Sequence, residues 1–289
     1  MNQSSRISAS MNSNKILFSL IIPIYNVTQY LLTNCLDSVV AQLSEHNDCE
    51  CLLIDDGSTD GSADICDNYA NKYDIFKVFH KENQGNCFAR NHGINKAVGK
   101  WILFLDDDDY LLDNYYNNIF NAVDIYGSHF NNICFNHKRL SHKDNDKEYI
   151  AAKRNAPLKE LKIRTIANSS FNAHCVIWTH IYSREFIVKN NIKFPETYTC
   201  PELHQYKDED SYFNLLCYNY DNLILELPFY GIAHRIREGS TNQKQQRFKQ
   251  VPNGYYLSDL YHDVMNRSIQ NPQLIKFLLQ KAQKFNISL

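Results

Sequence analysis

Residues 100–109 read KWILFLDDDD, a short apolar run that ends in four consecutive aspartates. The run is too short for a typical helix and predicts a buried strand. Three earlier apolar runs, at residues 18–24, 50–54 and 76–80, predict further strands. The first of them leads into PIYN (residues 23–26) and the second into DD (residues 55–56), so polar side chains follow these strands as well.

Segments with a helical spacing of apolar residues separate the strands. They cover residues 28–43, 62–73 and 85–98, and Gly99 is expected to end the last of them. This alternation is typical of right-handed crossovers, so the sequence predicts an α/β fold with a mainly parallel sheet and helices on both faces. Because ligands bind beyond the carboxyl ends of the strands in such sheets, we expect the polar strand ends to meet at one edge.

The remainder of the chain has weaker patterns. Residues 138–162 are charged and poor in apolar residues, which favours an irregular connection or a lid. Strand or helix signals return at residues 175–181, 212–220 and 223–236. Residues 1–14 are polar, and they predict a disordered tail without a secretory signal.

Composition excludes several classes of protein. The chain has 289 residues, 44% of them hydrophobic, which is ample for a large core. No run approaches the length of about 20 apolar residues that crosses a bilayer. A net charge of −2 gives no electrostatic support for a nucleic-acid partner. The nine cysteines form no CxxC pair, and we expect them to be buried and reduced in a cytoplasmic protein.

The four adjacent carboxylates, Asp106 to Asp109, repel one another at the end of a buried strand. A hard divalent cation relieves this repulsion, and oxygen ligands select Mg²⁺ or Mn²⁺. Alternate side chains of a strand face the same way, so Asp106 and Asp108 are expected to act together. The alternative is a solvated acidic turn.

A second polar group, Asp55–Asp56–Gly57–Ser58, could be an ordinary turn that leads into a helix cap. Because this segment is expected beside the loop of Pro23, Tyr25 and Asn26, it instead predicts one side of a binding site for a base and a ribose. Tyr25 offers a ring face for stacking, and Asp56 offers an acceptor for a ring N–H.

Four segments together resemble the successive signatures of family 2 glycosyltransferases. They are LIIPIYN (20–26), DDGS (55–58), NQG with ARNHG (83–85 and 89–93) and FLDDDD (104–109), and the resemblance extends over about residues 16–240. It implies the GT-A fold, inverting transfer from a nucleotide-activated sugar, and a divalent metal held by an Asp-X-Asp motif. It also implies a catalytic domain over residues 15–240, with a nucleotide-binding half (15–110) and an acceptor half (111–240).

The resemblance assigns roles within the first half. Asp106–Asp107–Asp108 occupies the Asp-X-Asp positions, where Asp108 would bind the metal and Asp106 the ribose or a metal-bound water. Asp109 matches an additional acidic residue without an assigned role. The implied nucleotide-sugar contacts are Pro23, Tyr25, Asn26, Asp55, Asp56, Asp106, Asp107 and Arg90, with Arg90 at the diphosphate or donor. For Arg90 the alternative is an ordinary arginine on a helix surface.

The second half carries less rigid matches. KDEDSYF (207–213) resembles the Gly-Glu-Asp-x-x-Phe segment of the family, which makes Asp210 the general base and Glu209 its acidic neighbour. WTHIYSR (178–184) resembles a stretch near the acceptor site and implies contacts by Trp178 and by His180, which replaces the usual lysine. His234 stands where many GT-A enzymes place a third metal ligand; a structural histidine is the alternative.

These matches predict the transfer of a hexose or N-acetylhexosamine, with galactose favoured, from a UDP-sugar to a saccharide or lipid-linked saccharide acceptor. The setting would be bacterial capsule, O-antigen or lipooligosaccharide synthesis. One alternative is a nucleotidyltransferase, which residues 23–26 disfavour because they are neither glycine-rich nor basic. The other is a non-catalytic sugar-binding relative, against which the intact Asp106, Asp108 and Asp210 argue.

Residues 241–289 form a basic extension with seven Lys or Arg against two Asp. Within it, residues 274–285 have apolar side chains at helical spacing. One interpretation is a terminal helix that docks on the catalytic domain. The other is a helix that contacts anionic lipid at the inner face of the plasma membrane.

Overall fold

The computed structural model describes residues 15–140, 161–165, 176–196, 209–221 and 223–235. The first half alternates strands and helices as the sequence predicts. Its elements are β1 (Phe18–Ile24), α1 (Gln29–Leu43), β2 (Cys49–Asp55), α2 (Ser62–Lys72), β3 (Phe76–His80), α3 (Asn86–Lys96) and β4 (Trp101–Phe104). The predicted strands and helices of this half are therefore confirmed to within one or two residues.

The role predicted for Gly99 is wrong. Helix α3 ends at Lys96, and the backbone is already extended at Ala97, so Gly99 does not cap it. Instead, Gly99 N donates a hydrogen bond to Ser19 Oγ (2.8 Å), and the Ser19 hydroxyl donates to buried Glu50 (2.6 Å). A Cβ at Gly99 would lie 2.7 Å from the backbone nitrogen of Ser19, so this position requires glycine because β1 passes so close.

The described residues of the second half add short strands, helices and one 3₁₀ turn. They are β5 (Tyr110–Leu111), α4 (Tyr115–Tyr126), β6 (Asn132–Leu140), β7 (Lys162–Thr165), η2 (Ile177–Thr179), β8 (His180–Ser183), α6 (Arg184–Lys189), α7 (Glu209–Tyr220) and β9 (Leu223–Arg235). The connection predicted over residues 138–162 in fact begins inside β6. Residues 141–160 of that connection lie outside the described part of the chain, as do the tails 1–14 and 236–289.

The sheet has a parallel part and a mixed part. Its strand order is β3-β2-β1-β4-β8-β6-β9-β5, with β7 pairing to β9. Strands β3, β2, β1 and β4 are parallel, as predicted. From β8 onward the sheet is mixed, since β8 is antiparallel to both of its neighbours and β9 is antiparallel to β5 and β7. The mainly parallel arrangement therefore stops where the chain ceases to alternate one strand with one helix.

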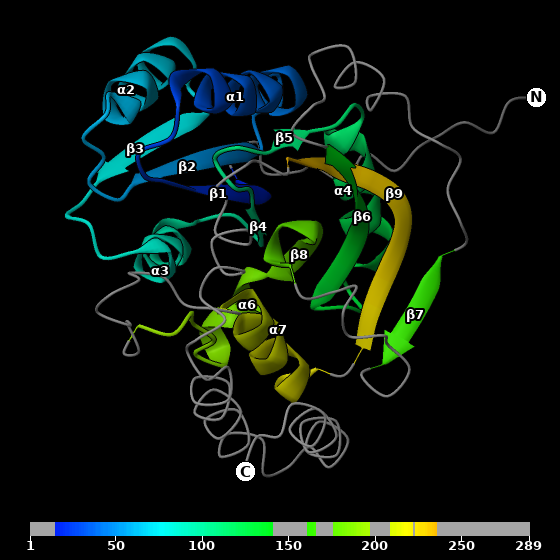
Figure 1. The fold of residues 1–289 in the computed structure, drawn as a ribbon. Coiled ribbons are helices and arrows are strands. Elements are labelled where there is room, and N and C mark those ends of the chain that lie inside the picture. The colour runs from blue at the N-terminus through cyan, green and yellow to red at the C-terminus, as the bar shows by residue number, and fades with distance from the viewer. Residues whose placement is uncertain (1–14, 141–160, 166–175, 197–208, 222, 236–289) are drawn as a thin grey trace, which may run out of the picture.

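Helices cover both faces of the parallel strands, as predicted. Figure 1 shows α1 and α2 on one face of β1–β3 and α3 on the other, with α6 and α7 farther along, near β8. Strand β2 is buried at every position, because helices pack on both of its faces. This packing fixes where β1, β2 and β4 end, and the loops at those ends lie on one edge of the sheet.

The contact between α3 and β1 supplies a test of this packing. A Cβ at Gly93 of α3 would lie 2.4 Å from Ile21 Cγ2 of β1, which is closer than real Cβ contacts come. We expect Gly93→Ala to lower the free energy of unfolding by about 1–3 kcal/mol, as overpacked cores do. Urea unfolding followed by circular dichroism measures the loss.

The exposed Asn95 on the same helix provides the control, and Asn95→Ala should leave the unfolding free energy nearly unchanged. Because Ile21→Ala removes the clashing methyl group, Gly93→Ala should cost less in that background than alone. Equal costs in both backgrounds would show that this contact does not limit the approach of α3 to the sheet.

Candidate active site at the carboxyl ends of the parallel strands

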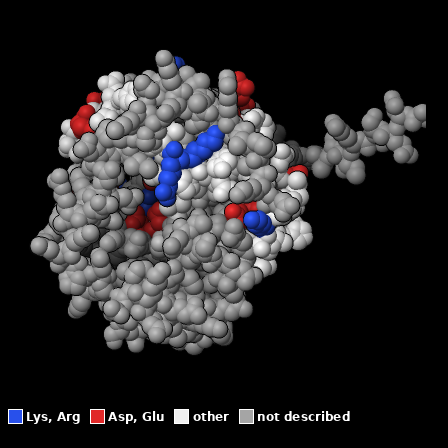
Figure 2. Space-filling view, turned by 45° about the vertical axis from the view of Figure 1, so that its right-hand side comes forward, with Lys and Arg blue, Asp and Glu red and all other residues white. Residues whose placement is uncertain are grey.

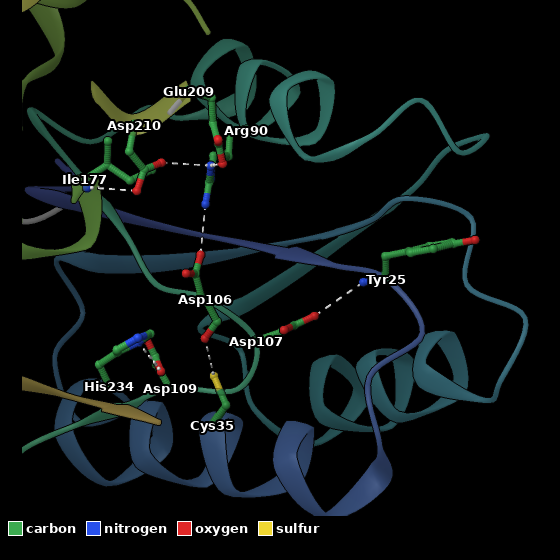
Figure 3. Close-up of polar contacts among 10 residues, drawn as sticks. All are labelled: Tyr25, Cys35, Arg90, Asp106, Asp107, Asp109, Ile177, Glu209, Asp210 and His234. Carbon is green, nitrogen blue, oxygen red and sulfur yellow. Dashed lines mark hydrogen bonds and ion pairs between the residues drawn. The ribbon is translucent and has the colours of Figure 1, made fainter. Parts of the chain in front are cut away.

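The four aspartates lie in a turn and not in a strand. Strand β4 ends at Phe104, and Asp109 N donates to the carbonyl of Asp106 (3.1 Å). The strand alternation expected to place Asp106 and Asp108 together therefore does not apply. Asp107 Oδ2 instead accepts from Tyr25 N (3.4 Å), whereas Asp106 and Asp109 face other partners, described below (Figure 3). Asp108 is buried.

Arg90 lies at the centre of the site. Its guanidinium is only 2% exposed, and Nη2 donates to Asp106 Oδ1 at 3.0 Å. The other terminal nitrogen, Nη1, donates to Glu209 Oε1 (3.0 Å) and to Asp210 Oδ1 (3.1 Å). One cation from α3 thus joins the acidic turn after β4 to the first residues of α7 (Figure 3). The alternative of an ordinary surface arginine is wrong.

Asp210 and Glu209 share this acidic environment, and their side chains are 19% and 20% exposed. Burial raises the pKa of Asp210 to about 8, because the guanidinium of Arg90 only partly offsets desolvation and the nearby carboxylates add to it. Burial also raises the pKa of Glu209. The second oxygen of Asp210, Oδ2, accepts from Ile177 N (3.4 Å). Both oxygens are thereby held in place, and each keeps a lone pair that can accept a proton.

Asp109 joins the acidic turn to strand β9. Its side chain is fully buried and accepts hydrogen bonds from Arg235 N (2.9 Å) and from His234 Nδ1 (3.1 Å). Burial raises the pKa of the Asp109 carboxyl, although the hydrogen bond from His234 opposes the shift. Burial would lower the pKa of His234, but the Asp109 carboxylate raises it above its ordinary value. Nδ1 is thus engaged, and Nε2 is the imidazole nitrogen that remains for a ligand.

The two expected acceptor contacts are buried in this structure. Trp178 stacks on His234, with ring centroids 4.9 Å apart, and meets His137 edge-on. The ring of His180 is fully buried, hydrogen-bonds Asn132 Oδ1 (2.7 Å) and stacks on Tyr182. These contacts place both residues in the packing beneath the site, and their predicted contact with an acceptor stays a prediction.

The loop after β1 presents an open aromatic ring. Tyr25 is 50% exposed, while Pro23 before it is half-buried at the end of the strand. Asn26 has a left-handed backbone (φ 46°), and its side chain accepts from Thr59 N (2.7 Å). Its own N–H donates to Ser58 Oγ (3.2 Å). The structure therefore places this loop beside residues 57–59, as the sequence predicts.

Asp55 and Asp56 organise that neighbouring loop. Asp55 accepts from Ser58 N (3.0 Å) and contacts His80 Nδ1 (2.9 Å). Asp56 forms an ion pair with Lys81 and accepts from the backbone of Gln84 and Gly85. Both carboxylates are buried. Their predicted contact with a base stays a prediction, because the hydrogen bonds described here join them to other groups of the protein.

The described residues contain no group of three His, Cys, Asp or Glu side chains placed to hold a metal. The donor atoms still suit a hard cation, since Asp106 is 30% exposed and His234 keeps Nε2. Mg²⁺ and Mn²⁺ sites of this kind are completed by substrate phosphates. The residues fit a metal that enters together with a diphosphate. Figure 2 shows a group of acidic side chains next to basic ones on the face in view.

Two supporting residues were absent from the predicted site. Asn91, next to Arg90, donates to Phe194 O (2.9 Å) and accepts from Phe194 N (2.9 Å). The ring of Phe194 then covers the guanidinium of Arg90, 5.3 Å from its Cζ. Asn91 belongs to the ARNHG segment, so its signal was visible, whereas nothing in the sequence near Phe194 marks it as a site residue.

Comparison with known proteins identifies the family. The model of glycosyl transferase family 2 matches residues 19–186, and the chain belongs to this family. The uncharacterized glycosyltransferase YibD of Escherichia coli is 32% identical over 197 residues, 64% of this chain and 53% of that protein. A poly(ribitol-phosphate) beta-glucosyltransferase of Bacillus spizizenii is 43% identical over 95 residues, 32% of this chain and 15% of that protein. The chain thus spans about half the length of YibD.

Solved structures show the same fold. Staphylococcus aureus TarS (residues 1–349) in complex with UDP-GlcNAc superimposes with a TM-score of 0.72 at 24% identity, covering 93% of this chain and 73% of that one. The mannosyltransferase PcManGT of Pyrobaculum calidifontis, in complex with GDP-Man and Mn²⁺, gives 0.62 at 14% identity, with 93% and 69% covered. The GT-A fold implied by the sequence is confirmed.

The buried Asp109 allows a test of the acidic turn. Asp109→Ala leaves His234 and the N–H of Arg235 without their acceptor, and each buried unpaired group costs about 1–3 kcal/mol. We expect Asp109→Ala to lower the unfolding free energy, measured by urea titration, by at least that amount. Asp107→Ala is the matched control from the same turn, because its hydrogen bond from Tyr25 is long and its side chain is partly exposed. Equal losses would contradict an anchoring role for Asp109.

Proposed function

We propose that the protein is an inverting glycosyltransferase that moves a sugar from a UDP-sugar to a saccharide hydroxyl. The observation that carries the proposal is the arrangement of Asp106 and Asp210 on opposite sides of one guanidinium. Asp106 follows β4 in the half with the exposed Tyr25, and Asp210 lies in the first turn of α7 in the other half. A donor held at the first carboxylate can therefore present its anomeric carbon toward the second.

Each side chain has a defined task in this proposal. Asp210 takes the proton of the acceptor hydroxyl as that oxygen attacks the anomeric carbon, and a single displacement inverts the configuration. Tyr25 stacks on the base and Asp106 meets the ribose or a metal-bound water. Asp108 and His234 would hold Mg²⁺ or Mn²⁺, which neutralises the charge of the departing diphosphate. No second protein nucleophile is needed.

The relatives support a UDP-sugar and a polymer of the bacterial surface. TarS was solved with UDP-GlcNAc, and the Bacillus spizizenii relative is named for β-glucosyl transfer to poly(ribitol-phosphate). We therefore propose a hexose or N-acetylhexosamine donor, with galactose included, and a saccharide or lipid-linked acceptor of a capsule, O-antigen or lipooligosaccharide. Among the described helices, none is long and apolar enough to cross a membrane. The membrane contact proposed for residues 241–289 lies outside the described residues.

The first test is a donor screen. The protein is incubated with a panel of UDP-, GDP- and dTDP-sugars and Mn²⁺, and released nucleoside diphosphate is measured. We expect one UDP-sugar to be consumed and a chelator to stop the reaction reversibly, with Asp108→Ala equally inactive. UDP binding without release of UDP from any donor would favour a non-catalytic relative. Neither binding nor release across the panel would contradict the proposed function.

The second prediction concerns the base. Asp210→Asn keeps the size of the side chain but cannot take a proton, so turnover should fall by about 10²–10⁴-fold while donor affinity is retained. A base must be unprotonated to act. Because burial raises the pKa of Asp210 to about 8, turnover should rise with pH through the neutral range and fall in acid. A flat profile from pH 6 to 9, or a loss confined to donor affinity, would remove Asp210 from this role.

A further inference from the structure

The sequence resemblance places Arg90 at the donor diphosphate, whereas the structure points elsewhere. We propose, resting on the function above, that Arg90 is a positioning residue that holds Asp210 and Glu209 from the donor side. In this proposal Arg90 is not a ligand of the diphosphate.

The two terminal nitrogens of Arg90 already use their hydrogen bonds, whereas its buried Nε has no hydrogen-bond partner among the described residues. Nη1 donates to Glu209 and to Asp210, and Nη2 donates to Asp106. Asn86, with its amide oxygen turned toward the guanidinium, lies 3.1 Å from Nη2. These four partners account for the four protons on the terminal nitrogens. A phosphate would have to displace a carboxylate from a side chain that is only 2% exposed.

The surroundings of Arg90 fix its position. Phe194 covers the guanidinium, and Asn91 holds Phe194 by two backbone hydrogen bonds. Phe194 also stacks on Phe213 of α7, with ring centroids 4.3 Å apart. The aromatic pair therefore joins the helix that carries Arg90 to the helix that carries the base. Such a scaffold suits a side chain that orients others, since a diphosphate ligand has to remain accessible.

The geometry requires arginine in particular. Glu209 and Asp106 are bound by different terminal nitrogens, so a planar fork with several fixed donors bridges the two halves. A lysine ammonium retains the charge but is a single point that cannot reach all three carboxylates at once. Arg90→Lys therefore separates charge from geometry: the positive charge stays while the position of Asp210 relaxes.

The experiment compares Arg90→Lys with the wild-type protein. UDP affinity in Mn²⁺ is measured by calorimetry, and turnover is measured with the donor found in the screen. We expect UDP affinity to change by less than about threefold. Turnover should fall by about 100-fold, because small misplacements of a reacting group have that effect. The rising limb of the pH profile should also move to higher pH, since fewer contacts favour the ionised carboxylate.

A control variant, a double-mutant cycle and a charge-balancing variant complete the test. Lys96→Gln removes an exposed cation from the same helix and should change neither UDP affinity nor turnover. A double-mutant cycle of Arg90→Gln and Asp210→Asn in urea unfolding measures the contact itself and needs no activity. Glu209→Gln in the Arg90→Gln background restores the charge balance if the single variant does not fold.

The outcomes separate this proposal from the proposed function. A tenfold or larger loss of UDP affinity with turnover intact would make Arg90 a diphosphate ligand and overturn the inference. Unchanged turnover together with an unchanged pH profile would leave Arg90 a purely structural residue, and additive unfolding energies would show no contact with Asp210. If the wild-type protein transfers no sugar, the proposed function fails, while the unfolding cycle still decides whether Arg90 holds Asp210.

Discussion

One buried cation among three carboxylates is the interaction on which the site depends. Removing a guanidinium from water is costly, and the cost is recovered only when excellent geometry satisfies its protons. The terminal nitrogens of Arg90 meet this condition through Asp106, Glu209 and Asp210, which come from both halves of the chain, while the buried Nε has no partner among the described residues. Because three negative groups surround one positive group, the balance is uneven, and burial raises the pKa of Asp210 to about 8. In the proposed function, this raised pKa favours Asp210 as the group that takes the proton of the acceptor hydroxyl.

The parallel strands explain why these groups can meet. Right-handed crossovers return each strand in the same direction, so the loops after β1, β2 and β4 lie on one edge of the sheet. The mixed part of the sheet then brings the other half alongside. Strand β8 runs antiparallel to β4, and the 3₁₀ turn just before it places Ile177 N against Asp210. Thus the short antiparallel strands position Asp210, the proposed base, while the parallel strands position the loops of the proposed nucleotide site.

The first half was predictable because its signals are local. The spacing of apolar residues that distinguishes a strand from a helix can be read within each segment. Residues 18–24 and 76–80 form strands as predicted. For the candidate site, the sequence indicated which residues gather at one edge of the sheet, but not which of them contact one another. The contact between Arg90 and Asp210 spans 120 positions, and no spacing rule reports it. The sequence also left open whether Asp106–Asp109 form a turn, because an acidic run after a strand has the same sequence whether it stays extended or turns.

The same turn explains why no three-residue metal group is assembled among the described residues. It directs Asp106 to Arg90 and Asp109 to His234, so two of the four carboxylates already have cationic or imidazole partners. The protein itself thus relieves only part of the repulsion expected within the run, since Asp108 and Asp106 still raise the pKa of Asp109. A divalent cation then lacks a complete protein cage, and diphosphate oxygens would have to supply the missing ligands. Under the proposed function, the metal would therefore bind together with the nucleotide, and loading of the donor would complete the site.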